Sequence, residues 1–127
     1  MNYSYKREVQ LSYAEAVAKT KAELAKEGFG ILTEVDVTAT LKQKLGVDYD
    51  NYVILGACNP LLAYKALQAN RAVGLFMPCN VIVYEGTDKV VVSAMRPTIA
   101  LGVVEDAALL EIARVAEEKF EKVIANI

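Results

Sequence analysis

Residues 53–85 constrain the fold more than any other part of the chain, because they form its most apolar long stretch. Residues 52–58, 79–85 and 89–96 each have the character of a β-strand. Apolar side chains occupy both alternating sets of positions in these strands, so both faces of the resulting sheet need a cover. Helices can cover one face. We expect a second subunit, or a pocket between the sheet and long loops, to cover the other.

Two helix starts are marked by capping residues. Ser12 and Glu15 have the spacing of a capping box, in which each side chain accepts a hydrogen bond from the other residue's backbone N–H. Gly28 stands where a left-handed residue ends a helix. Asn59 is a favoured N-cap and Pro60 a favoured first helical residue, which predicts another helix over residues 61–69.

Two more helices are predicted by other signals. Thr38 is expected to cap a short helix over residues 39–45, which Gly46 ends. The chain is expected to be helical from about Glu105 to its end, because apolar residues such as Phe120 recur there at helical spacing. Glu117 is assigned to the solvent-facing side of this helix.

The order of these elements indicates an α+β fold in a single domain spanning residues 1–127. Residues 3–11 and 29–37 alternate apolar and polar side chains and add two strands. We therefore predict a two-layer fold with a mostly antiparallel sheet and helices on one face. Because the later strands are apolar on both sides, we also predict a homo-oligomer, a dimer or larger, with sheet surface in the contact.

The composition excludes several classes of function. The chain has no histidine, which removes Ser-His and Cys-His nucleophile pairs and every histidine-containing zinc site, and its two cysteines cannot close an all-cysteine one. A net charge of −2 without a block of like charge argues against nucleic acid and membranes as partners. The first residues carry no apolar signal segment, so we expect a cytoplasmic protein with reduced thiols.

The two cysteines mark the main candidate site, because the dipeptide Cys-Asn occurs twice, as Cys58-Asn59 and Cys79-Asn80. Cys58 directly precedes a helix N-cap, and a helix N-terminus lowers a thiol pKa, whereas burial raises it. A reactive thiol and a small buried hydrophobe are both open interpretations. If the two sulfurs are close, they could form a reversible disulfide or bind a soft metal such as Cu(I) or Zn(II). Asn59 and Asn80 could hold a small polar ligand, or serve only as cap and turn residues.

Glu34 and Asp36 form a second candidate site. They lie two residues apart on a predicted strand, so their side chains share a face and could act as an acid/base pair. Like charges this close raise one of the two pKa values. A solvated sheet face is the alternative interpretation.

Three segments resemble the signature segments of the domain-of-unknown-function family 302. They are GFGILTEVDV at residues 28–37, VILGACNP at 53–60 and PCNVIVYE at 78–85. The resemblance covers most of the chain, from the first helix through the hairpin, and includes all six candidate site residues. It implies a compact two-layer α+β domain similar to the TATA-binding-protein-like fold, often self-associating, with no assigned activity. Nucleic-acid binding is not carried over with the fold, because fold does not fix function.

Three hypotheses of function follow. In the first, the protein binds a small ligand or soft metal near Cys58, Asn59, Cys79 and Asn80 without catalysis. In the second, it is a thiol-based enzyme or redox sensor with Cys58 as nucleophile and Cys79 as resolving thiol. In the third, it is a structural interaction module whose conspicuous residues serve packing and capping. The sequence indicates no particular cofactor and leaves open whether the protein is an enzyme.

Overall fold

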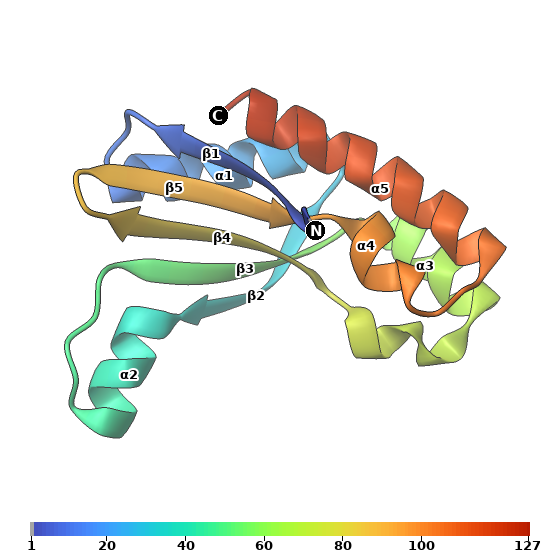
Figure 1. Ribbon diagram of the computed structural model, residues 1–127, viewed down its shortest axis with the longest axis horizontal. Coiled ribbons are helices and arrows are strands. Elements are labelled where there is room, and N and C mark those ends of the chain that lie inside the picture. Colours follow the sequence, from blue (N-terminus) through green and yellow to red (C-terminus); the bar gives the residue numbers. More distant parts are fainter. Residues whose placement is uncertain (1) are drawn as a thin grey trace.

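The computed structural model describes residues 2–127 (Figure 1). Within them, the strands are β1 (Ser4–Val9), β2 (Gly30–Asp36), β3 (Tyr52–Cys58), β4 (Cys79–Gly86) and β5 (Lys89–Met95). The helices are α1 (Tyr13–Lys26), α2 (Val37–Leu45), α3 (Pro60–Ala69), the 3-10 helix η1 (Arg71–Phe76), α4 (Pro97–Gly102) and α5 (Ala107–Ala125). None of the helices in this range combines the length and the apolar character that a membrane span requires.

The five strands form one sheet in the order β1-β5-β4-β3-β2, and every neighbouring pair is antiparallel. This confirms the α+β class and the antiparallel sheet. The register places Leu55 opposite Val81, and Val81 opposite Ala94. Paired residues of antiparallel strands point to the same face, so these three side chains form one apolar row across the centre of the sheet.

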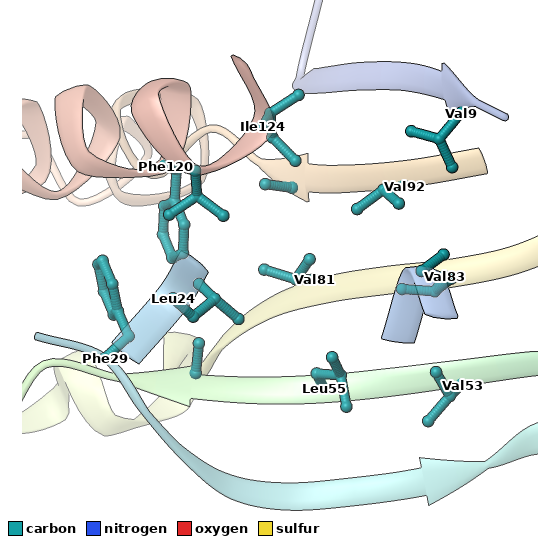
Figure 2. Close-up of a cluster of buried hydrophobic side chains, with 14 of the residues drawn as sticks. Val9, Leu24, Phe29, Val53, Leu55, Val81, Val83, Val92, Phe120 and Ile124 are labelled. Atoms are coloured by element: carbon teal, nitrogen blue, oxygen red, sulfur yellow. The ribbon is translucent and has the colours of Figure 1, made fainter. Parts of the chain in front are cut away.

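The main core lies between this face of the sheet and the helices α1 and α5 (Figure 2). Leu24 from α1 and Phe120 from α5 are fully buried over the apolar row. The Phe120 ring stacks on Phe29, with 4.5 Å between the ring centroids. The predicted stripe of the C-terminal helix is confirmed, since Phe120, Val123 and Ile124 all belong to this core.

The predicted caps are largely confirmed, with one correction. Ser12 forms the complete capping box with Glu15, and Asn59 caps α3. The cap of α2, however, is Asp36, whose carboxylate accepts from the backbone N–H of Ala39. Thr38 was the wrong choice, because its hydroxyl donates to the Asp50 carbonyl and accepts from the Tyr52 N–H. These two bonds tie the start of α2 to the start of β3.

Glu117 contradicts the prediction that it faces solvent. Only 8% of its surface is exposed, and its Oε1 accepts hydrogen bonds from the backbone N–H and the hydroxyl of Thr98, at 3.0 and 2.6 Å. Its Oε2 accepts from the Arg96 guanidinium and from the Tyr5 hydroxyl. Since α4 has no side-chain cap of its own, the carboxylate of α5 performs that role at the start of α4.

The opposite face of the sheet carries the alternate positions. Ile54 lies opposite Ile82, and Tyr52 lies opposite Tyr84 with the two rings stacked at 5.3 Å. Both pairs point away from the core because strand side chains alternate between faces. Figure 1 shows α1 and α5 together on the other side of the sheet, and α2 beyond the β2 edge.

Candidate functional site

An apolar cavity lies at one end of the sheet, where β3 ends and β4 begins. Figure 1 shows α3, η1, α4 and the first half of α5 gathered at this end. The cavity measures about 60 Å³ and is partly open to solvent. The sheet contributes Ala57, Cys58 and Cys79 to its wall. The helices contribute Leu62, Ala63, Ala66, Val73, Phe76, Pro97, Leu101, Ile112, Ala113 and Ala116.

Cys79 reaches the cavity because the chain crosses β3 closely just before it. An added Cβ on Gly56 would collide with Thr33 Oγ1 and would lie 2.7 Å from Pro78 Cγ. Glycine is therefore required for the Pro78 ring to lie against β3. The Met77–Pro78 peptide is cis, and Cys79 follows it as the first residue of β4.

The thiol of Cys79 is poorly suited to ionisation. Burial, together with the nearby Cys58, raises the pKa of the Cys79 thiol to about 11. A thiol with this pKa is almost wholly protonated at neutral pH, so it contributes to the cavity wall as a small, polarisable apolar group.

Cys58 lines the same cavity as Cys79 and is near enough to contribute to the raised pKa of the Cys79 thiol. Of the two opposing effects on the Cys58 thiol, burial prevails and raises its pKa. The N-terminus of α3 offers few N–H donors that could stabilise a Cys58 thiolate. Pro60 has no N–H, and the Leu62 N–H donates to the Asn59 side chain at 3.3 Å. Both cysteines are free thiols.

The two asparagines do not share a site. Asn59 lines the cavity, but its amide is already used, accepting from the Leu62 N–H and donating to the Glu27 carbonyl at 3.4 Å. Asn80 lies opposite Gly56 in the register, on the other face of the sheet from Cys79, and its side chain is exposed. A polar ligand held between the two amides therefore has no geometric support.

Glu34 and Asp36 lie on the helix-covered side of the edge strand β2, and both are exposed. Each has a separate partner. The Glu34 carboxylate accepts two hydrogen bonds from Lys21 Nζ at 3.0 and 3.1 Å, while Asp36 caps α2. Their positions fit a solvated ion pair and a helix cap better than an acid/base pair.

Metal ligands are not assembled around the cavity. In the range 2–127, no three side chains of cysteine, aspartate and glutamate lie together in a way that could hold a metal ion. The two thiols thus have no carboxylate beside them. A cavity with this lining can hold an apolar group and shield it from water, and it offers no group that is charged at neutral pH.

Several wall residues were not among the predicted site residues. Pro97 and Leu101 belong to α4, a helix that is not among the predicted elements and that directly follows the predicted strand over residues 89–96. Proline is also a favoured first residue of a helix, so this signal was available in the sequence. Ile112 and Ala116 lie at the helical spacing that predicts the C-terminal helix, and this spacing alone does not show that they border a cavity.

An α+β domain with a five-stranded antiparallel sheet and an apolar end cavity is the class that these observations define. The family described as "Domain of unknown function DUF302" matches residues 5–127, and the chain belongs to this family. The chain is similar to the crystal structure of an uncharacterized conserved DUF302 protein from Bacillus stearothermophilus. The two are 32% identical, with a TM-score of 0.93 over 99% of this chain and 98% of that one. No curated protein matches this chain.

Proposed function

We propose that this protein binds the apolar end of a small molecule in the cavity lined by Cys58 and Cys79. The observation that supports the proposal is the lining itself, which combines aliphatic, aromatic and protonated thiol groups around about 60 Å³. An apolar space of this kind holds water poorly and gains free energy when an apolar group fills it. An engineered cavity of about 150 Å³ takes up benzene, so this smaller space suits a short aliphatic end.

The part of the cavity that is open to solvent determines where the polar end of the ligand lies. A molecule whose apolar end fills the cavity would leave its other end in water. Asn59 keeps both of its hydrogen bonds in this arrangement, so the polar end of the ligand would remain solvated. Specificity would then come from the size and shape of the apolar end.

A thiol-based enzyme is less well supported. A nucleophilic cysteine needs a lowered pKa or an adjacent base, and both thiol pKa values are raised by burial. A soft metal would have to deprotonate the same two thiols and would find no third ligand of the usual kind beside them. Binding of a neutral apolar group requires neither a lowered thiol pKa nor deprotonation of the two thiols.

Two further points belong to this proposal. Helices α1 and α5 over one face of the sheet give the two-layer arrangement expected for the TATA-binding-protein-like fold, and superposition on members of that fold would test it. The two free thiols fit a reducing compartment, so we place the protein in the cytoplasm, which cell fractionation would test.

The test uses dissolved xenon and 1-butanol as probes of the cavity, followed by amide chemical shifts. We expect shifts that saturate at the wall residues, above all at Cys79 and Ala66. In the Ala63→Leu variant a larger side chain occupies the cavity, and the shifts should disappear. Ala69→Leu is the matched control, because Ala69 is exposed on the same helix and the substitution is identical. Absence of shifts in the native protein, or equal binding by Ala63→Leu, would refute the proposal.

A further inference from the structure

Helix α2 is unusually poorly packed for a helix of this size. None of its nine residues is buried, and its neighbours in the chain are the edge strand β2 and the loop to β3. An isolated helix of this length is marginal in water, because most helical stability comes from tertiary packing of one face. Its last residue, Leu45, is apolar and 70% exposed. The helix and the loop after it thus present an unpartnered apolar surface.

A row of tyrosines connects this surface to the helix-free face of the sheet. Tyr49 in the loop lies 6.3 Å from Tyr52 between ring centroids, and Tyr52 stacks on Tyr84 at 5.3 Å. Tyr49 is 52% exposed. Ile54 and Ile82 continue the apolar surface on the next row of the sheet. We call these five residues the tyrosine face. Tyrosine side chains are enriched at protein interfaces, where they bury large apolar area at little entropic cost.

The charges beside the tyrosine face balance one another. The segment that contains α2 and the following loop carries two lysines, Lys42 and Lys44, and two aspartates, Asp48 and Asp50. Lys42 donates to Asp48 at 2.9 Å, which leaves Lys44 and Asp50 without a side-chain ion pair among the described residues. A two-fold contact brings a surface against its own copy, so a net charge would repel itself and a balanced pair can form across the contact.

A second group of exposed apolar residues, on α3 and η1, has charged residues of one sign beside it. Leu61, Tyr64 and Leu75 on α3 and η1 are 62–85% exposed, and the charged residues of these two helices are Lys65 and Arg71. Two copies of that surface would bring like charges together. Charge complementarity therefore selects the tyrosine face as the one suited to meet a second copy of this chain.

We propose that two copies of this chain form a two-fold symmetric dimer through the tyrosine face, with α2 of each copy packed against the other. Lys44 of one copy pairs with Asp50 of its partner at the rim. The contact covers the helix-free side of the sheet and gives α2 the packing that it lacks within one chain. The apolar cavity lies at the other end of the sheet and takes no part.

The test measures mass in solution by light scattering and sedimentation over a range of protein concentrations. The native chain should have twice its mass of 13.9 kDa. Tyr49→Lys should raise the dissociation constant of the dimer by about tenfold or more, because a charged side chain would enter the centre of the contact. Tyr49 lies in an exposed loop, so circular dichroism should show an unchanged fold. Leu75→Lys, at a residue that is 85% exposed in the other cluster, is the matched control and should remain dimeric.

Three results would overturn the proposal. The first is a native chain that stays monomeric at the highest concentration measured. The second is a Tyr49→Lys variant as dimeric as the native chain, and the third is dissociation by Leu75→Lys with no effect of Tyr49→Lys, which would assign the contact to α3 and η1. A double exchange, Lys44→Asp with Asp50→Lys, should keep the dimer, whereas Lys44→Asp alone should weaken it.

Discussion

Replacement of Glu117 by glutamine tests the role of a charged side chain that is buried beside the core. The carboxylate accepts from donors on β1, the segment before α4, and α4 itself. Glutamine offers a single oxygen, which we assign to the two Thr98 donors, so Arg96 and Tyr5 lose their common acceptor. A buried hydrogen bond to a charged group contributes about 1.5–3 kcal/mol. The Arg96 side chain keeps 26% of its surface exposed, so hydrogen bonds to water would replace part of the lost contribution.

We therefore expect Glu117→Gln to lower the free energy of unfolding by about 2–3 kcal/mol at pH 7. Urea unfolding followed by circular dichroism measures this loss, and with a slope of roughly 1–3 kcal/mol/M the midpoint should fall by about 1 M. Glu118→Gln is the control, because Glu118 is the next residue in the chain and is exposed, so its replacement should change stability by less than about 0.5 kcal/mol. A Glu117→Gln loss as small as that of the control would refute the reasoning.

The pH dependence of the unfolding free energy of native protein and of Glu117→Gln gives an independent check. Burial works to raise the pKa of the Glu117 carboxyl, but the hydrogen bonds from Thr98 and Arg96 outweigh it and lower the pKa. A lowered folded pKa means that the stabilisation is present above the unfolded value of about 4.3 and is lost as the pH falls through the folded value. The stability gap between native protein and Glu117→Gln should therefore shrink in acid. A gap that widens would show that the buried carboxyl is protonated.

Three further predictions concern the core and the cavity. Phe120→Ala should cost about 3–5 kcal/mol in urea unfolding, since the ring is fully buried on Phe29; a loss below about 1 kcal/mol would contradict this packing. Gly56→Ala should cost about 1–3 kcal/mol, because its methyl group meets a threonine side chain and a proline ring, and a neutral effect would show that the crossing relaxes freely. Iodoacetamide should alkylate Cys58 before Cys79 at every pH from 7 to 9, because burial raises the Cys79 pKa to about 11; mass spectrometry of native protein would reveal the reverse order.

The parts of the fold that the sequence predicts well are those with local causes. The capping box of Ser12, the Asn59–Pro60 helix start and the strand alternation depend on neighbours in the chain, and all three are confirmed. Asp36 and Thr38 show the limit of this reasoning. Both are favoured cap residues, and the choice between them depends on Asp50 and Tyr52, which bind Thr38 across the loop.

The candidate site is predictable only in part, for a related reason. Cys58 and Cys79 were expected to share a site, and both line the cavity. Their protonation was not predictable, because it depends on burial by residues far away in the sequence. Glu117 illustrates the same dependence, since its position on a helix suggests solvent and its partners Arg96 and Thr98 lie about twenty residues earlier.

The contact between Gly28 and Asn59 has a consequence for the evolution of the chain. Gly28 has a φ of +83°, and an added Cβ would lie 3.0 Å from Asn59 Nδ2. The same amide group donates to the Glu27 carbonyl, so it joins the end of α1 to the start of α3. Aspartate at position 59 would keep the cap and place a carboxylate oxygen against that carbonyl. Relatives that keep the Asn59 amide are therefore expected to keep the glycine as well, because a side chain at position 28 would meet the amide and would also be strained by the left-handed φ.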